Sequence, residues 1–425
     1  MIIFISSFFM LEYHRIGRRE IWLLLVGLSF ITFPWSERIN SFFILLIVLH
    51  FFWDKNLHIK SRNFKKNLIK IFPFAFFFLL HFFFIRFSNI ETISLQTIEV
   101  KLSFLILPIV FSGENFWDKK NSHFIFKFFA FSLLLSVLFC LYQYYIIYYP
   151  VEQWSKVFKR MYFSRIMHPG YYSNFFMIAF IYCSLSLFEE KNLSRFDKKL
   201  FLIFCIIFLC VLLILASKTS LIVLFLFFLI LLWKKIASLF KSYLKYVLLF
   251  LSPLVLLLFF LFTPGIRNRV LETQNELTEI GSDVDFDNST GSRLAAWAVE
   301  WDLIMQNSWK GYGIGNANDV LLNELRNKNY TDLVENKMHT HQQFFHTWLD
   351  LGLLGLISLL ALFAFLFYYF IKNKIEMGTW ATLLLFVYCL TDDALEVQAI
   401  LVFFILLITL YLFQPTTYQN KNKLF

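Results

Sequence analysis

The sequence has few charged residues and few cysteines. Aspartate, glutamate, lysine and arginine make up only 16% of its 425 residues, whereas a soluble domain carries about 25%. The five cysteines all lie in apolar segments and none lies in the polar stretch 264–345, which argues against a disulfide framework and against a thiolate metal site. Residues 1–10 are apolar but follow no basic region and are too short to span a bilayer, so we expect no secretory signal.

The sequence is instead rich in apolar residues: 59% of its residues are hydrophobic and 21% are aromatic. The apolar residues form continuous runs rather than an alternating pattern, which favours membrane helices over a barrel. A span needs about 17–25 residues, so some of the runs are short. We predict an all-α integral membrane protein with about 12 transmembrane helices, near residues 20–36, 40–53, 68–87, 101–113, 124–149, 171–188, 199–216, 219–233, 245–263, 346–371, 377–391 and 396–413.

Lysine and arginine are concentrated in every second connection between these runs. The basic clusters lie within residues 15–19, 55–66, 119–120, 191–199, 234–245, 372–374 and 421–423. Basic loops stay in the cytoplasm, so we expect both termini there and the connections 88–100, 150–170, 217–220, 264–345 and 391–396 outside. This arrangement predicts nine helices within residues 1–263, one outer loop domain over 264–345, and three helices with a cytoplasmic tail over 346–425.

The long outer loop contains an amphipathic pattern followed by a glycine-rich break. Large apolar residues recur at intervals of three to four positions, as in a helix lying on the membrane face or on the bundle; they are Leu294, Trp297, Trp301, Ile304 and Met305. Thr290 or Ser292 is the expected cap. Gly311, Gly313 and Gly315 then predict a tight turn where the backbone approaches the bundle or a ligand. We interpret the acidic stretch 283–287 as a solvated loop, with calcium binding as the alternative.

Histidines lie where this loop returns to the apolar part of the chain. Thr340 and Gln343 fit a capping box, which would make His341 the first residue of the tenth span. The positive end of the helix dipole disfavours an imidazolium there, which suits a general base. The alternative is that His339, His341 and His346 are interfacial polar residues at the start of a helix. His339 and His341 could also bind zinc, but no further ligand is obviously placed to complete such a site, so we expect neither metal nor cofactor.

Two cations on the predicted outer side are candidate anion-binding groups. Arg293 lies in the first turn of the amphipathic helix, where a bound anion would be held by the guanidinium and free backbone N–H groups together. Lys218 lies in a turn between two spans, where the positive-inside bias disfavours lysine. The alternatives are an arginine facing solvent or lipid phosphate, and a lysine that reaches the interface.

Four pieces of the sequence, in order, resemble the O-antigen ligase/polymerase superfamily of bacterial envelope glycosyltransferases. They are His168-Pro-Gly-Tyr-Tyr-Ser, then Ser217-Lys-Thr-Ser, then Ser292-Arg293-Leu with Trp297 and Gly311-Tyr-Gly-Ile-Gly, and last His339-Thr-His341-Gln-Gln-Phe-Phe before Leu351-Gly-Leu-Leu-Gly355. The resemblance covers about residues 160–360. Two departures are Lys218, where the family usually has arginine, and Gln342, where it has asparagine. Lysine keeps the charge but loses the bidentate fork.

The resemblance implies a GT-C-like enzyme of the bacterial inner membrane whose active site faces the periplasm. The donor would be an undecaprenyl-diphosphate-linked glycan, and the acceptor the lipid A core or another glycan. Membrane lipids are the other expected partners, and nucleic acid is not one. By position, Arg293 and Lys218 match the family's diphosphate-binding arginines and His341 its activating histidine. His168, His339, Asp392, Gly313 and Gly315 are expected to shape the donor or acceptor site.

Three alternatives to a ligase remain open from the sequence. A polysaccharide polymerase shares the same motifs, and a protein O-glycosylating relative would use the same chemistry. A lipid or glycan transporter would instead need polar residues in the middle of the membrane or broken helices in matching halves. The apolar runs contain mostly phenylalanine, leucine and isoleucine, and the polar groups gather at the predicted outer boundary.

Overall fold

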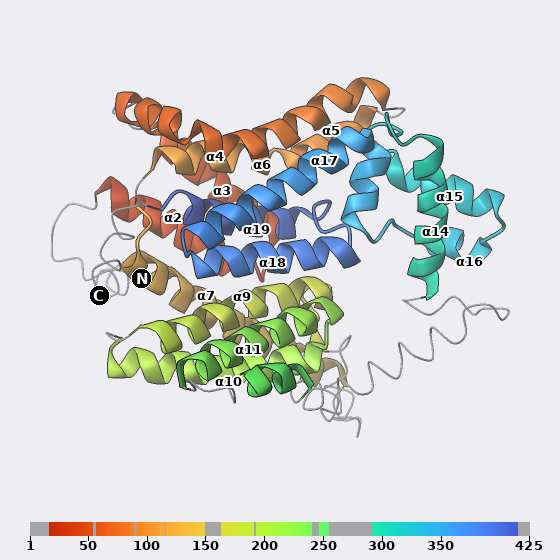
Figure 1. The fold of residues 1–425 in the computed structure, drawn as a ribbon. Coiled ribbons are helices and arrows are strands. Elements are labelled where there is room, and N and C mark those ends of the chain that lie inside the picture. Colours follow the sequence, from red (N-terminus) through yellow and green to blue (C-terminus); the bar gives the residue numbers. More distant parts are fainter. Residues whose placement is uncertain are drawn as a thin grey trace.

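The computed structural model describes residues 17–53, 57–88, 91–114, 116–148, 163–190, 193–239, 246–254 and 291–414. These residues form helices joined by short connections and contain no strand (Figure 1). The helices are α2 (Arg18–Thr32), α3 (Glu37–Phe52), α4 (Leu57–Phe84), η1 (Ile85–Phe87), α5 (Glu91–Lys101), α6 (Ser103–Gly113), α7 (Lys119–Tyr148), α9 (Pro169–Glu189), α10 (Arg195–Leu215), α11 (Lys218–Leu239), α14 (Gly291–Gln306), α15 (Ala317–Asn327), α16 (Thr331–Glu335), α17 (Gln343–Lys372), α18 (Glu376–Thr391) and α19 (Gln398–Leu412).

In the described part of the chain, seven helices are long and apolar enough to cross a membrane. They are His58–Phe87, Leu95–Gly113, Lys119–Ile146, Pro169–Phe188, Arg195–Leu215, Lys218–Ser238 and Gln343–Lys372. Helices α18 and α19 are apolar but shorter, and α2 and α3 have 15 and 16 residues. The all-helical membrane fold is therefore confirmed, whereas the count of about twelve spans stays a prediction.

Several predicted features lie outside the described residues. These are Arg15, the part of the ninth run beyond residue 254, residues 264–290 of the outer loop with the acidic stretch 283–287 and Thr290, and the tail from residue 415. One predicted span has a different construction. The run 101–113 is only the second part of an apolar segment in which α5 ends at Lys101 and α6 begins at Ser103.

Helix α19 lies at the centre of the bundle. Every residue from Ala399 to Phe413 is buried, as expected for a helix that carries no charge and is apolar on all sides. The ring of Phe403 packs against Phe33, Phe129 and Phe175, with centroids 5.0, 5.7 and 4.7 Å away. These contacts join the end of α2, α7 and α9 around α19 through aromatic rings.

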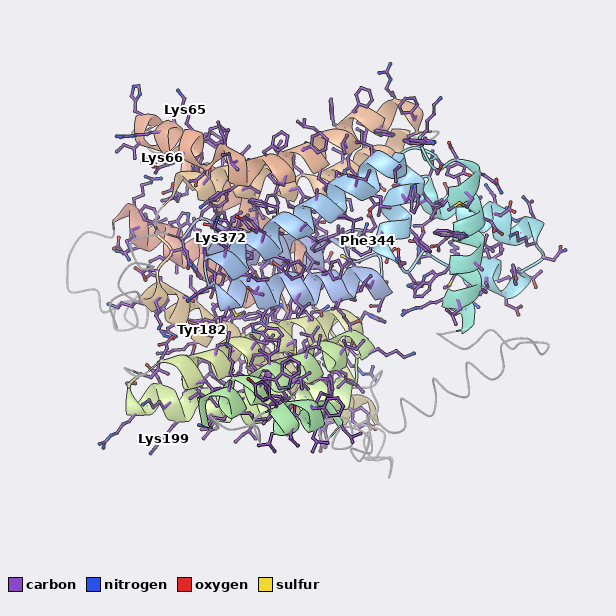
Figure 2. All side chains as sticks on the ribbon, in the orientation of Figure 1. Lys65, Lys66, Tyr182, Lys199, Phe344 and Lys372 are labelled. Atoms are coloured by element: carbon purple, nitrogen blue, oxygen red, sulfur yellow. The ribbon has the colours of Figure 1, made fainter. Side chains whose placement is uncertain are left out.

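The two ends of the bundle differ in composition. Helices α14, α15 and α16 lie at one end, outside the parallel helices (Figure 1). At the opposite end, Figure 2 shows the labelled side chains of Lys65, Lys66, Lys199 and Lys372. Ion pairs also join elements at that end, such as Arg19–Asp118 at 2.7 Å. The described basic connections thus share one end, which we call the basic end, and α14–α16 mark the other.

Helix α14 is amphipathic, but its buried face is not the predicted one. Ala296, Val299, Leu303 and Ile304 are buried and form a small core with α15, α16 and the start of α17. Of the predicted stripe, Ile304 is buried and Trp297 half-buried, whereas Leu294, Trp301 and Met305 are exposed. The small side chains of Ala295 and Ala296 lie on the buried face and let α14 approach its neighbours closely, and this packing outweighs the size of the apolar residues. The helix begins at Gly291, so Ser292 lies inside its first turn.

Candidate functional site

The start of α17 differs from the predicted capping box. The helix begins at Gln343, and its cap is Gln342, whose side-chain oxygen accepts a hydrogen bond from the Phe345 backbone N–H. The Thr340 hydroxyl instead bonds to Nδ1 of His346 at 3.0 Å. Thr340 therefore does not cap the helix, because the buried His346 ring engages its hydroxyl. His346 is 5% exposed, so it is a buried residue rather than the interfacial one considered from the sequence.

His341 consequently precedes α17 instead of opening it. Its backbone has a positive φ of 45°, a left-handed conformation that is uncommon for residues other than glycine and often marks functional sites. Its Nδ1 lies 3.1 Å from Oδ1 of Asp392. Its Nε2 has no hydrogen-bond partner among the described residues. With a proton on Nδ1 facing the carboxylate, Nε2 is the nitrogen able to accept another proton.

Asp392 is the charged partner in this pair. It follows the last residue of α18, and its Oδ1 also accepts the Asp393 backbone N–H at 3.1 Å. Burial opposes its charge, but the hydrogen bonds from His341 and Asp393, together with the charges of His341 and Arg293, lower the pKa of Asp392 to about 2. The carboxylate is therefore ionised at neutral pH and stabilises positive charge on His341.

Thr391, the residue before Asp392, contacts both segments that carry the predicted anion-binding residues Arg293 and Lys218. The Arg293 guanidinium donates to the Thr391 carbonyl at 3.3 Å. The Thr391 hydroxyl bonds to the Thr219 hydroxyl at 2.9 Å, and Thr219 follows the half-buried Lys218 at the start of α11. The segments that carry Lys218, Arg293 and Asp392 thus converge on one residue, next to His341.

Helix α14 also holds the loop that carries His341. Nε1 of Trp297 donates to the Thr340 carbonyl at 3.2 Å. Arg293 and Trp297 are four residues apart and share one face of α14, so this face spans both loops of the site. Figure 2 places Phe344, in the first turn of α17, on the side of the bundle nearest α14. The site therefore lies at the end of the bundle opposite the basic end.

Two further histidines lie beside this centre. His168 caps α9, where its Nδ1 accepts the Gly170 N–H at 3.2 Å, and its exposed ring lies 5.0 Å from that of Tyr171. His339 is exposed, and its ring centroid lies 6.1 Å from that of His341. Burial of its nitrogens lowers the pKa of His339, and the neighbouring histidines add to this effect. Both imidazoles can offer hydrogen-bonding groups to a ligand.

The glycine-rich turn packs against protein backbone. Gly313 has φ of 94° and its N–H donates to the Asp350 carbonyl at 3.1 Å. A side chain there would collide with the Phe87 carbonyl at the end of η1. The Gly315 N–H donates to the Asp350 carboxylate at 3.0 Å. The close approach predicted for this turn is therefore an approach to the bundle, and a substrate-binding role for Gly313 and Gly315 stays a prediction.

The structure brings together carboxylates that the sequence did not reveal as a group. Ligand atoms of His341, Asp392 and Asp393 all lie within 4.8 Å of one another. The sequence argument that no carboxylate is placed to complete a metal site was therefore wrong. The Arg293 charge beside Asp392 disfavours a second cation there, and His341 already shares Nδ1 with Asp392. The group is better suited to a histidine–carboxylate pair than to a metal centre.

Two acidic residues near the site, Asp393 and Glu300, had no role assigned to them from the sequence. Burial raises the pKa of Asp393 to about 6, and the charge of Asp392 adds to this effect. Glu300 is fully buried in α14, and neither of its carboxylate oxygens has a hydrogen-bond partner among the described residues. Burial therefore raises the pKa of Glu300 well above its usual range. The sequence signal for Asp393 is the Asp392-Asp393 pair directly after an apolar run. No sequence pattern marks Glu300 as buried.

Comparison with known proteins gives one family. Residues 203–360 match the family model described as O-antigen ligase, and no curated protein matches the chain. The matched segment runs from α10 into α17 and contains Lys218, Arg293 and His341. Asp392 and Asp393 lie beyond it. The match confirms the resemblance drawn from the motifs.

Proposed function

Residues 203–360 match the O-antigen ligase family model, and from this premise we propose that the chain transfers a glycan from undecaprenyl diphosphate to the lipid A core. The family has ligase- and polymerase-type members, which are glycosyltransferase-like enzymes that use lipid-linked glycans and glycan acceptors. The apolar helices are those of a multi-pass membrane protein. The proposed setting is the bacterial inner membrane, with about twelve spans in a GT-C-like arrangement, cytoplasmic termini and a periplasmic site.

In the proposed reaction, Nε2 of His341 removes the proton of an acceptor hydroxyl. The hydroxyl oxygen attacks the anomeric carbon of the donor sugar, and the bond from that carbon to the diphosphate oxygen breaks with inversion. Its electron pair leaves on the diphosphate, where Arg293 and Lys218 stabilise the added charge. Positioned proton removal contributes about 10²–10⁴-fold to a rate. No metal enters this scheme.

The observation that carries the proposal is the 3.1 Å contact between His341 and Asp392 beside the turn that Arg293 contacts. The carboxylate fixes the proton on Nδ1, so Nε2 faces the acceptor as a base. As proton transfer makes the ring cationic, the ionised Asp392 stabilises it. The Arg293 guanidinium, on the other side of Thr391, stabilises the negative charge that develops on the leaving group.

The two departures from the family pattern have different consequences. Lys218 supplies a point charge rather than a fork, so we assign bidentate phosphate contact to Arg293 and long-range charge stabilisation to Lys218. Gln342 caps α17 through its side chain. Its longer side chain therefore serves the fold of the turn, and the proposed chemistry does not involve it.

The test is a transfer assay with the purified full-length protein, an undecaprenyl-diphosphate-linked glycan and a lipid A core acceptor. His341→Ala and Arg293→Ala should each reduce transfer by about 100-fold or more. His123→Ala is the matched control, because His123 also pairs with a carboxylate, Glu190 at 2.6 Å, but at the basic end. Full activity of either site variant would defeat the assignment.

The acceptor class is tested separately in cells. A strain that lacks a ligase makes lipopolysaccharide without attached glycan, whereas a strain that lacks a polymerase attaches a single repeat unit. We expect the first pattern after deletion of this gene, and restoration of the ladder by the wild-type protein but not by His341→Ala. The second pattern would assign the chain to the polymerases.

A further inference from the structure

A cluster of polar side chains, all buried except the half-buried Glu396, lies directly behind the His341–Asp392 pair. It contains Lys101 of α5, residues Gln343, His346 and Asp350 of α17, and Glu396 of the turn before α19. Lys101 is 1% exposed, and its ammonium donates to the Leu395 carbonyl at 2.7 Å and to Glu396 at 2.5 Å. Removing such charges from water is energetically costly, so the cluster is poorly explained by stability alone.

One half of the cluster fixes the turn that carries Asp392. The Glu396 carboxylate accepts from Lys101 and also from the Gln343 side-chain amide at 2.9 Å. The Gln343 side-chain oxygen accepts the Leu395 backbone N–H at 2.7 Å. The turn from Asp392 to Glu396 is therefore attached at its far end to both α5 and α17. A carboxylate at the near end has little freedom to move away from His341.

The other half fixes the loop that carries His341 and the glycine-rich turn. His346 bonds through Nδ1 to Thr340, the residue before His341, while its Nε2 lies 3.5 Å from Asp350 and 3.6 Å from Glu396. The Asp350 carboxylate accepts the backbone N–H groups of Gly315 and Ala317 at 3.0 and 2.9 Å. His346 thus connects the loop of His341 to the turn of Asp392 through one ring.

We propose that this cluster consists of positioning residues, with His346, Glu396 and Lys101 holding His341 and Asp392 at hydrogen-bond distance. The inference rests on the proposed function for its catalytic consequence, but the geometry it describes is measurable without transfer. Without the cluster, His341 and Asp392 are still present but move apart. A misplacement of about 1 Å can reduce a rate by about 100-fold.

The first experiment measures the reactivity of His341 with diethyl pyrocarbonate by mass spectrometry, in the full-length protein in lipid nanodiscs. The double variant Lys101→Met with Glu396→Gln removes both charges at nearly constant shape. We expect faster modification of His341, because Nδ1 leaves Asp392 and both ring nitrogens can then react, and unchanged modification of His168. Transfer of the lipid-linked glycan should fall by about 10- to 100-fold.

The chain offers a matched control at the basic end. Lys60 and Glu114 form a buried pair at 3.1 Å, with 5% and 4% of the side chains exposed, compared with 1% and 20% for Lys101 and Glu396. Lys60→Met with Glu114→Gln should change neither His341 reactivity nor transfer. If both double variants shift the thermal unfolding temperature alike and only the first alters His341, the cluster has a positioning role rather than a general structural one.

A second variant keeps the test decisive if the double variant does not fold. Thr340→Val removes only the hydroxyl that bonds to His346, with little change of volume, and should also increase His341 modification, by a smaller factor. Unchanged His341 reactivity and unchanged transfer in the folded variants would overturn the inference. Absence of transfer by the wild-type protein would instead count against the proposed function, while the reactivity measurement would still decide the positioning role.

Discussion

The two ends of the bundle contain similar ionisable groups in different settings. At the basic end, His123 of α7 is held at both nitrogens, by Glu190 at 2.6 Å and by the Tyr182 hydroxyl at 2.8 Å. At the other end, His341 is held only at Nδ1, by Asp392, in the described part of the chain. A histidine with both nitrogens engaged stabilises the fold, whereas one with a free nitrogen can transfer a proton.

The backbone differs between the two ends as well. His123 lies within a regular helix, but His341 and Asp392 lie in connections outside α17 and α18, and His341 has a positive φ. Helix α4 has 28 residues and at about 1.5 Å per residue is about 42 Å long, so the two ends are separated by about the thickness of a bilayer. The proposed chemistry therefore lies at the end where rigid helices present irregular loops.

The largest expected difference between the ends comes from the carboxylates. Asp392→Asn should reduce transfer by about 100-fold or more, because the amide can hold the His341 ring in the wrong tautomer and supplies no charge. Glu190→Gln should leave transfer unchanged. Steady-state rates with saturating donor and acceptor measure the effect. Equal losses in both variants would remove the distinction between the two ends.

Two glycines sharpen the comparison through stability. Gly313→Ala should destabilise the protein by about 2 kcal/mol or more, because φ is positive and the new methyl group meets the Phe87 carbonyl. At the basic end, a methyl group on Gly113 meets the side-chain ring of Phe51, which can move. Gly113→Ala should therefore cost less. Thermal unfolding of the two purified variants provides the measurement, and an equal cost would contradict this account of the turn.

The cations provide a smaller effect. Arg293→Lys should reduce transfer by about tenfold, because lysine keeps the charge but cannot bind the diphosphate with two parallel hydrogen bonds. Lys218→Arg should retain activity or increase it. Arg19→Lys, an exposed arginine paired with Asp118 at the basic end, serves as the control. A stronger loss from Lys218→Arg than from Arg293→Lys would reverse the assigned phosphate contacts.

The comparison also shows how far the sequence could lead. Continuous apolar runs predicted the helices, and the lysine bias predicted that basic connections share one end. The motifs pointed to Arg293, Lys218, His341 and Asp392 because each carries a charge or an imidazole at an apolar boundary. These features depend on composition and on the local order of residues, and both can be read from a single sequence.

Features that depend on long-range packing could not be read in the same way. The cap at Gln342 instead of Thr340 depends on His346, whose buried position is set by Asp350 and Glu396. Lys101 and Glu396 are 295 residues apart in sequence, and no local pattern connects them. The buried face of α14 depends on how closely its alanines approach other helices, which the spacing of large apolar residues does not reveal.

The smallest predicted effect separates the two adjacent aspartates by pH. The pKa of Asp393 is raised from its usual value of 3.8 to about 6. This carboxylate therefore binds a proton more tightly in the folded state than in the unfolded state. The unfolding temperature should therefore fall as the pH rises from about 4 to about 6 and stay flat above that. Asp393→Asn should remove this fall and increase stability at pH 7.5.

Asp392 has the opposite sign, because its pKa is lowered to about 2. It contributes stability that is complete above about pH 4 and is lost as the pH falls toward 2. Asp392→Asn should therefore reduce the unfolding temperature at pH 7.5 and leave the change between pH 4 and 6 in place. Differential scanning fluorimetry of both variants from pH 4 to 8 tests the pair. Identical profiles for the two variants would contradict the view that the ionised Asp392 stabilises His341 whereas the fold disfavours the ionised form of Asp393.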